Sequence, residues 1–307
     1  IYNDMFTEGD FYAEIKRVFE DENITKISSG IKKDIVLLHG RNIEFNGKYF
    51  DTSVGGYILN PSRSNYEISA VANEFLDIEI PDLKETLKKE KCTVSSLNSE
   101  TFSRIAAAET DAVSALWKYE KAEAEKHEQA HLLYDIELPL VKVLASMEIE
   151  GFKVDRQKLS DFSKYLSENI AVLESKIYEI AGEEFNISSP KQLGVILFEK
   201  LNLPAVKKTK TGYSTNAEVL EKLRGYNEIV EYILEYRMLT KLKSTYADGL
   251  LAVIGSDGRI HSSFNQTVTV TGRISSTEPN LQNIPQRKEL GREIRKMFVA
   301  KNDEYTL

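Results

Sequence analysis

The sequence is poor in cysteine and has no long apolar run. Its single cysteine, Cys92, excludes a disulfide within the chain and fits a reducing compartment. No stretch of eighteen apolar residues occurs, which excludes an ordinary transmembrane helix. The first ten residues are acidic and polar and show no signal-peptide pattern. Internal repeats and low-complexity segments are also missing. With 29% charged residues, these absences indicate a soluble protein of ordinary globular composition.

Charge is distributed unevenly along the 307 residues, whose net charge is −8. Residues 1–185 hold 22 basic and 35 acidic side chains, whereas residues 186–301 hold 18 basic and 11 acidic ones. A basic excess inside an acidic chain favours a second half that binds a polyanion. Chance clustering on solvated faces explains the charge equally well, so charge alone leaves both interpretations open.

The first 80 residues alternate short strand-like and helix-like patterns, which predicts an α/β domain. "ITKIS" and "KYFDTSV" are typical of strands, "GGYIL" is helix-like, and "KKDIVLLHG" predicts a short helix that ends at Gly40. Residues 82–100 are polar and charged and predict a loop region.

From Phe102 onward the pattern becomes helical, and Pro139 is expected to kink or divide this run. A second long helix is predicted over residues 156–181, between a cap at Asp155 and a stop at Gly182. Its apolar residues recur every three or four positions, which places them on one face.

Capping signals mark further helices. Ser189 precedes Pro190, and Thr215–Glu218 has the form of a capping box. A long helix is predicted over 228–254. The alternation in "RIHSSF" and "TVTVT" predicts strands.

Two basic stretches could bind phosphate. The loop "KKTKTG", which includes Lys210 and Thr211, precedes a helix start, where backbone N–H groups favour anions. On the helix 228–254 the polar side carries Arg237, Lys241, Lys243 and Ser244. Arg237 and Lys241 are one turn apart, as are Lys241 and Ser244, so this side could run along a sugar–phosphate backbone. A mobile surface loop and a solvated helix face are the respective alternatives.

The stretch "TGRISSTEPNLQNIP" follows neither a two-residue nor a 3.6-residue apolar period. Arg273 comes directly after a glycine, where the backbone can approach a partner closely. The uncharged polar side chains suit the acceptors of a DNA minor groove. They are Ser275, Ser276, Thr277, Asn280, Gln282 and Asn283. A generic polar loop is the alternative.

Carboxylates in the first half give a weaker signal. Asp34 and Asp51 could hold a divalent metal only together with two further acids.

Three of these segments resemble family A DNA polymerases, the group of bacterial DNA polymerase I. "TGRISSTEPNLQNIPQRKELGREIRKMF" is similar to the segment that enters the palm of these enzymes. "FNISSPKQLGVILFEKLNLPAVKKTKTGYSTNAEVLEKL" and "YRMLTKLKSTYADGLL" are similar to the thumb, and all three occur in the family's order. The resemblance covers about Leu133 to the end and is closest to the Bacillus-like enzymes.

The first half resembles the 3′–5′ proofreading exonuclease domain of this family more loosely. "KISSGIKKDIVLLHGRNIEFNGKYFDTSVGGYILNP" is similar to its second motif and puts Asp34 at a metal-ligand position. In "RIAAAETDAVSALW", similar to the third motif, Ala106 replaces a tyrosine and Thr110 replaces the metal aspartate, with Asp111 one place out of register. The first motif is absent. The resemblance therefore implies a vestigial domain without proofreading activity.

The resemblance implies an architecture of three parts. An α/β ribonuclease-H-like, exonuclease-like domain (residues 1–125) would be followed by a mainly α-helical thumb (126–258) and the first strands of a polymerase palm (259–307).

It also implies site residues. Arg273 would reach the minor groove at the primer-terminal pair, and Arg287 would lie near nucleotide or primer phosphates. The remaining contacts to the duplex would come from Ser275, Ser276, Asn280, Gln282 and Asn283 at the palm entry and from Lys210, Thr211, Arg237, Lys241, Lys243 and Ser244 on the thumb.

The family's palm aspartates and fingers helix come after the point where this sequence stops. We therefore expect an internal fragment, inactive alone, of a monomeric DNA-directed DNA polymerase. The parent would act on primer–template DNA with deoxynucleoside triphosphates and Mg²⁺ in the bacterial cytoplasm, at the nucleoid and away from membranes.

One alternative is a ribonuclease-H-like 3′–5′ exonuclease, which would need four metal carboxylates where only Asp34 is placed. Another is a non-catalytic DNA-binding module.

Overall fold

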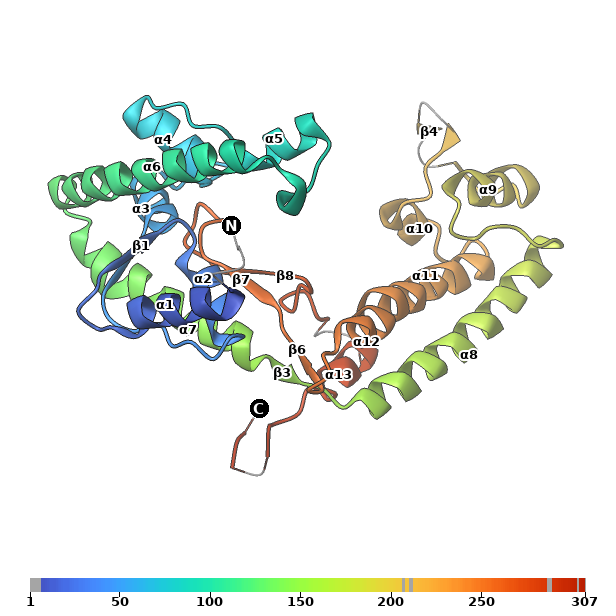
Figure 1. Cartoon of the computed structure of the whole chain (residues 1–307). Coiled ribbons are helices and arrows are strands. Elements are labelled where there is room, and N and C mark those ends of the chain that lie inside the picture. The colour runs from blue at the N-terminus through green and yellow to red at the C-terminus, as the bar shows by residue number, and fades with distance from the viewer. Residues whose placement is uncertain (1–6, 206–207, 210–211, 286–288, 303, 307) are drawn as a thin grey trace. The chain divides into compact units, whose positions relative to one another are not determined.

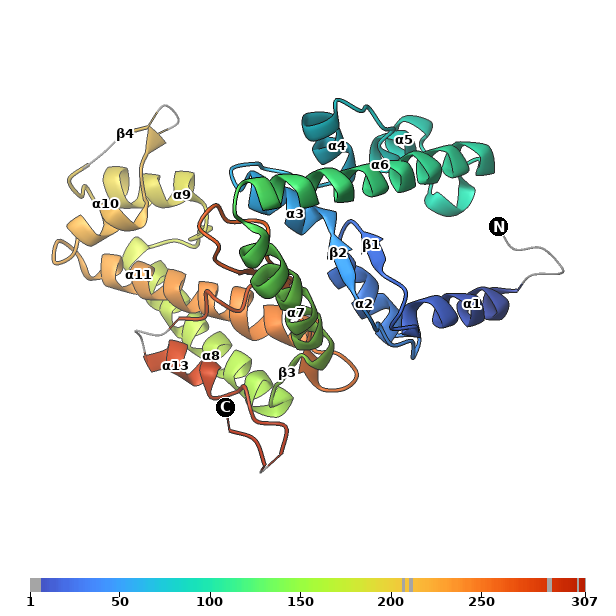
Figure 2. The same cartoon turned by 90° about the vertical axis from the view of Figure 1, so that its left-hand side faces the viewer.

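The chain forms two compact units, each described separately below. The computed structural model describes residues 7–205, 208–209, 212–285, 289–302 and 304–306. Unit 1 comprises Ile1–Gly151 and Ser262–Gln282, and unit 2 comprises Phe152–His261 and Asn283–Leu307 (Figures 1 and 2). The three-domain division from the sequence stays a prediction.

Unit 1 is built on a small parallel sheet covered by helices. β1 (Lys26–Ser28) and β2 (Tyr49–Asp51) pair in parallel across α2 (Ile31–His39), which makes a βαβ connection. The other α-helices of this unit are α1 (Glu8–Glu20), α3 (Thr52–Leu59), α4 (Ile68–Leu76), α5 (Leu83–Glu90), α6 (Ser99–Lys126) and α7 (Leu138–Glu150). The predicted α/β character of the first 80 residues is confirmed.

Buried side chains from the sheet and the long helices share one core in unit 1. Phe50 of β2, Leu116 of α6 and Leu133 are fully or almost fully buried in it. Burying such apolar surface is the main favourable contribution to folding.

The prediction of a loop over residues 82–100 was wrong. This stretch contains α5 and a short 3₁₀ helix, η1 (Val94–Ser96). The Asp82 side chain caps α5 by accepting a hydrogen bond from the Glu85 backbone at 2.8 Å. No residue of α5 is fully buried, so the sequence lacks the apolar stripe that reveals a packed helix.

The helical run after Phe102 is divided, but not at Pro139. α6 ends at Lys126, and the chain resumes as a π-helical turn, η2 (Leu132–Glu137), that continues into α7. Pro139 lies in the first turn of α7. There the wide π turn precedes it, and its missing N–H leaves few helical hydrogen bonds unmade.

Unit 2 is mainly helical and centres on two long segments. α8 (Arg156–Ala181) packs beside α11 (Glu228–Lys241), which continues through the π-helical turn η4 (Leu242–Asp248) into α12 (Gly249–Val253) (Figure 1). Asp155 caps α8, and Gly182 ends it in a left-handed conformation. Both predicted helices are therefore confirmed, as are most residues of their buried stripes.

The remaining elements of unit 2 are short. They are β3 (Phe152–Lys153), α9 (Pro190–Val195), η3 (Ile196–Lys200), β4 (Lys208–Thr209), β5 (Gly212–Tyr213), α10 (Ala217–Lys222), β6 (Arg259–Ile260) and α13 (Glu289–Arg295). β3 pairs antiparallel with β6, and the Asp155 N–H donates to the Met297 carbonyl at 2.8 Å. These contacts join the first residues of unit 2 to the segments near which the chain leaves it.

A short hairpin in unit 1 contains the first part of the irregular stretch, as far as Thr277. β7 (Ser263–Asn265) pairs antiparallel with β8 (Ser275–Thr277). The strand predicted for "TVTVT" was wrong, because residues 267–271 form the loop between them. Within the part of the chain described here, no helix is long and apolar enough to span a bilayer.

Candidate nucleic-acid interface

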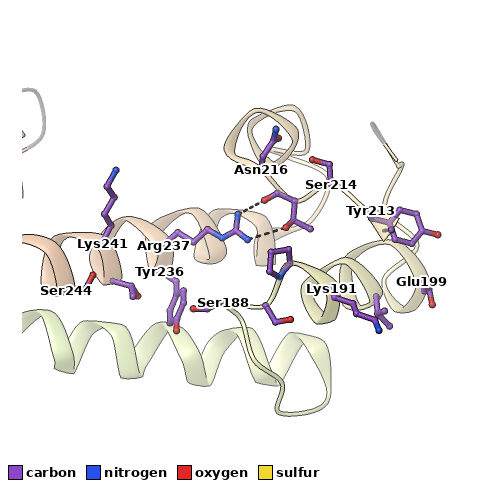
Figure 3. A pocket seen from close by; sticks show the side chains of 16 residues that line it. Ser188, Lys191, Glu199, Tyr213, Ser214, Asn216, Tyr236, Arg237, Lys241 and Ser244 are labelled. Atoms are coloured by element: carbon purple, nitrogen blue, oxygen red, sulfur yellow. Dashed lines mark hydrogen bonds between the residues drawn. The ribbon is translucent and has the colours of Figure 1, made fainter. Parts of the chain in front are cut away.

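Unit 2 contains a cleft of about 1080 Å³ beside α11 (Figure 3). The start of α9, strand β5, the loop before α10 and one side of α11 line it. The lining includes Ser188, Ser189, Lys191, Glu199, Tyr213, Asn216, Arg237, Thr240, Lys241 and Ser244. Three positively charged side chains (Lys191, Arg237 and Lys241) and one carboxylate (Glu199) therefore line the cleft.

Arg237 crosses the cleft to the loop before α10. Its guanidinium donates to both the carbonyl and the hydroxyl of Thr215, the latter at 3.3 Å (Figure 3). Thr215 is 3% exposed and Arg237 is half-buried. Burial lowers the pKa of Arg237, because the charged form loses hydration. No carboxylate of the described residues pairs with it.

The same bonds correct a prediction from the sequence. Thr215 is not the helix cap of a capping box with Glu218. Asn216 caps α10 instead, by accepting from the Val219 N–H at 2.9 Å. Both residue types cap well, and the neighbouring Arg237 decides between them because it uses the Thr215 hydroxyl.

Lys241 and Lys191 extend the positive charge of this wall. Both side chains are exposed, and neither forms an ion pair with any residue that the structure describes. Ser244, one turn after Lys241, is exposed beside it and adds a hydroxyl. Arg237, Lys241 and Ser244, which the sequence placed on one polar face, therefore line a single cleft.

Lys243 is placed differently. It does not line the cleft, and its amine contacts Asp248 at 2.5 Å. Burial alone would raise the pKa of Asp248, but hydrogen bonds from Lys243 and Ser163 outweigh it and lower that pKa. Lys243 is thus partly neutralised inside unit 2. Lys210, Thr211 and Arg287 lie outside the described residues.

The hairpin of unit 1 presents Arg273 in its loop. The side chain is exposed, and it has no hydrogen-bond or ion-pair partner among the described residues. Gly272 just before it has a φ of 75°, a left-handed conformation that glycine adopts without strain. The Thr269 hydroxyl donates to the Arg273 carbonyl at 2.7 Å and closes the loop.

The polar residues after Arg273 serve largely to hold their own segment. Ser276 is fully buried and bonds to Ser262 at 2.7 Å. The Gln282 amide donates to the Ile274 carbonyl at 2.7 Å, and the Asn280 side chain accepts from the Gln282 N–H at 3.0 Å. The burial of Ser276 leaves its hydroxyl bonded within the protein.

Two other polar residues of this stretch, Ser275 and Asn283, lie in different surroundings. Ser275 is half-buried, and its hydroxyl has no hydrogen-bond partner in the described structure. Asn283 is exposed, belongs to unit 2, and accepts a hydrogen bond from the Tyr246 hydroxyl through its carbonyl. Duplex contacts by Ser275, Ser276, Asn280, Gln282 and Asn283 stay predictions.

Comparison with known proteins assigns both halves of the chain to one kind of enzyme. Residues 156–307 match the family model described as DNA polymerase family A, and residues 7–85 match that of the DNA polymerase I ribonuclease H-like domain. The chain belongs to DNA polymerase family A. The predicted family and the predicted fold class, a ribonuclease-H-like domain followed by helical and palm-entry parts of a polymerase, are thereby confirmed.

Relatives of this family A chain are similar along its whole length. DNA polymerase I of Bacillus subtilis (strain 168) is 43% identical over 100% of this chain and 34% of the relative, and that of Geobacillus stearothermophilus is 43% identical over 94% and 33%. A solved structure of the POL domain of Pol1 from M. smegmatis, in complex with DNA primer-template and dNTP, has a TM-score of 0.78 at 34% identity. This match covers 98% of our chain and 49% of that one. The chain thus spans about a third of the length of these curated relatives.

The exonuclease-like part of this family A chain offers no complete metal centre in the described residues. Asp34 is partly buried and accepts from the Ser28 hydroxyl at 2.8 Å, and burial raises its pKa. Asp51 accepts from the Gly30 and Ile31 N–H groups at the start of α2 and caps α3 by accepting from the Ser53 N–H, so it has a structural role. No three His, Cys, Asp or Glu side chains gather there or elsewhere in the described ranges. These residues do not fit a two-metal nuclease site.

Sequence reasoning missed some members of the interface. Lys191 and Ser188 line the cleft, but the sequence suggested only the capping role of Ser189. A lysine directly after a Ser–Pro helix start was the available signal. A cation at that position lies beside the free backbone N–H groups of the first turn, and both favour an anion. Nothing local marked Thr215 as the acceptor for Arg237, since 22 residues separate them.

Proposed function

We propose that this chain is the part of a bacterial DNA-directed DNA polymerase that holds the primer–template duplex. The observation that carries the proposal is the cleft of unit 2, in which Lys191, Arg237 and Lys241 have no carboxylate partner among the described residues. Such unneutralised cations favour a phosphate backbone, which positions a protein without specifying sequence. The M. smegmatis relative with its bound primer-template supports the same partner.

Arg273 would contribute a contact of another kind. Its exposed guanidinium has donors available for the acceptors that every base pair shows in the minor groove. These acceptors occupy nearly the same positions in all correct pairs and shift in a mismatch. One arginine can therefore test base-pair geometry without reading the sequence.

The polymerase reaction itself is proposed for the whole protein. The described carboxylates do not form a metal site. The divalent ion, which we expect to be Mg²⁺, would be held by residues of the whole protein outside the third of the relatives' length that this chain matches. Mg²⁺ would align the primer 3′-hydroxyl with the incoming phosphate. Arg287 would lie near that deoxynucleoside triphosphate. We further propose a monomer that acts at the nucleoid in the bacterial cytoplasm.

Binding of this chain to a labelled primer–template duplex, measured by fluorescence anisotropy across a salt series without metal, tests the proposal. Three to five phosphate contacts predict a slope of roughly −3 to −5 in a plot of log affinity against log salt. Lys241→Ala should reduce the steepness by about 0.9, because one phosphate contact is lost.

Lys164→Ala is the matched control. Lys164 is an exposed lysine of the same unit that does not line the cleft, so its removal should leave the slope unchanged. A duplex affinity that does not depend on salt, or an equal change in both variants, would contradict the assignment of the cleft.

A further inference from the structure

The hairpin that presents Arg273 belongs to the same compact unit as the exonuclease-like helices. Residues Ser262–Gln282 fold with Ile1–Gly151 to form unit 1, although 110 residues of unit 2 separate them in the chain. The two segments are joined by hydrogen bonds at both β7 and the following loop. The contacts made by the exonuclease-like segment therefore bear on how Arg273 is held.

β7 is fixed by a charged pair from two helices. The Glu148 carboxylate of α7 accepts from the Phe264 N–H at 2.7 Å, and the Lys32 amine of α2 donates to the Phe264 carbonyl at 2.8 Å. Lys32 and Glu148 also form an ion pair with each other. Directly after β7, the buried Gln266 side chain donates to the Glu137 carbonyl at 2.8 Å.

The loop beyond β7 is held by one tyrosine. Tyr57 of α3 is 4% exposed, and its hydroxyl donates to the Thr269 carbonyl at 2.7 Å. Its ring packs edge-on against Tyr66 with the centroids 5.6 Å apart, so the hydroxyl projects from a fixed position. In Figure 1 this loop turns back beside α3.

Thr269 links that anchor to Arg273. Its carbonyl accepts from both the Tyr57 hydroxyl and, at 3.4 Å, the Gly272 N–H. Its own hydroxyl donates to the Arg273 carbonyl at 2.7 Å. A continuous series of hydrogen bonds therefore runs from α3 through Thr269 to the backbone of Arg273.

We propose that Tyr57 of the exonuclease-like segment is a positioning residue for Arg273, acting through Thr269. The inference rests on the proposed function, in which Arg273 contacts the minor groove. A side chain that tests base-pair geometry must itself be held within about 0.5 Å, since a looser donor would tolerate shifted acceptors. The exonuclease-like segment, whose described residues form no complete metal site, thus has a role in DNA synthesis as the support of the hairpin.

Hydrogen exchange of this chain tests the anchor without DNA. Tyr57→Phe keeps the ring and removes the hydroxyl, so we expect amides in 267–274 to exchange about three- to tenfold faster, as one lost hydrogen bond predicts. Tyr66→Phe is the matched control. The Tyr66 hydroxyl also donates to a carbonyl at 2.7 Å, but this carbonyl belongs to Asn60 and not to Thr269. Equal exchange in the two variants would overturn the proposal.

Duplex binding tests the link to Arg273. Affinities for matched and terminally mismatched primer–templates give a discrimination ratio for each variant. Tyr57→Phe and Thr269→Val should lower the ratio severalfold, whereas Tyr66→Phe and Thr269→Ser, which keeps the hydroxyl, should not. In an Arg273→Ala background Tyr57→Phe should have no further effect, since both changes act on one contact.

The two proposals fail in different ways. Additive effects of Tyr57→Phe and Arg273→Ala on discrimination would overturn the positioning role while leaving duplex binding intact. A chain that binds duplex but discriminates no better than its Arg273→Ala variant would overturn the minor-groove role of Arg273, and the positioning role with it. Absence of duplex binding would count against the proposed function, and the exchange difference between Tyr57→Phe and Tyr66→Phe would still decide whether the anchor exists.

Discussion

Arg237 on α11 donates to both polar oxygens of Thr215, the residue that precedes the cap of α10. This pairing joins two segments 22 residues apart and gives a half-buried cation two acceptors. A guanidinium is suited to this geometry because its donors are planar and fixed, whereas a lysine amine offers a single point of charge.

Arg237→Lys is therefore expected to destabilise unit 2. The variant leaves one Thr215 acceptor unpaired in a buried position, which should lower the free energy of unfolding by about 1–2 kcal/mol. Urea unfolding followed by far-ultraviolet circular dichroism, which reports on the helices of both units, measures the change. Arg224→Lys, which changes an arginine of exposed ion pairs, should cost less than about 1 kcal/mol. A larger loss in Arg224→Lys would contradict the structural role of Arg237.

Lys243 and Lys241 should differ in duplex binding although they are two residues apart. Lys243 is paired with Asp248, so Lys243→Ala should change the salt slope by less than about half of the 0.9 expected for Lys241→Ala. Anisotropy titrations at four or more salt concentrations resolve the difference. Equal slopes for the two variants would show that the Lys243–Asp248 pair opens when DNA binds.

The stability of unit 1 should fall as pH rises. Burial, and to a lesser extent Asp51, raises the pKa of Glu120 to about 9, and neither carboxyl oxygen has a partner in the described structure. The unfolded chain loses this proton near its ordinary pKa of about 4.3. Between these values the unfolded state binds fewer protons than the folded one, so the free energy of unfolding decreases with rising pH.

Glu120→Gln should remove most of this decrease between pH 5.5 and 8.5 and should stabilise unit 1 at pH 8.5 by more than about 1 kcal/mol, the value of one pKa unit. Trp117 is the only tryptophan and lies on the same helix, so its fluorescence in urea reports on this unit. Glu100→Gln, an exposed carboxyl of the same helix, is the control. An unchanged pH dependence in Glu120→Gln would show that another group causes it.

Gly55→Ala should strongly destabilise unit 1. A Cβ atom there would lie 2.2 Å from a Glu120 oxygen and 3.2 Å from the Phe50 ring, so the buried Glu120 side chain would have to shift. We expect a loss of about 2–3 kcal/mol despite the better helix propensity of alanine. Gly9→Ala in α1, where the added Cβ meets only ordinary contacts, should be neutral or stabilising. Rescue of Gly55→Ala by Glu120→Ala would identify the clash.

Local signals predicted the elements whose ends are decided locally. Asp155 and Gly182 bound α8 because a cap and a left-handed stop act within one turn of the chain. Helical spacing likewise placed the cleft residues Arg237 and Lys241 together, since residues one turn apart on one helix share a side.

Three of the errors have a common physical cause, which is that distant partners decided the outcome. The alternation of "TVTVT" favours a strand, but the Thr269 carbonyl is used by Tyr57, 212 residues away. Ser276 was expected to contact a DNA minor groove, but it is buried and bonds to Ser262 on the facing chain segment. Thr215 could have been a cap until Arg237 took its hydroxyl. No single-sequence pattern contains these pairings.

The discontinuity of unit 1 also sets an order of events during protein synthesis. The first stretch of unit 1 ends at Gly151 and its second begins at Ser262. The side chains that bond Phe264 and Thr269 therefore lack these partners while the intervening segment is translated. At about 5–20 residues per second, this interval lasts several seconds to tens of seconds. The helical unit cannot complete its fold in that time either, because its last part, Asn283–Leu307, is translated after Ser262–Gln282. The nascent exonuclease-like segment must wait with unfilled sites, and it is during this interval that chaperones and proteases would find it most accessible.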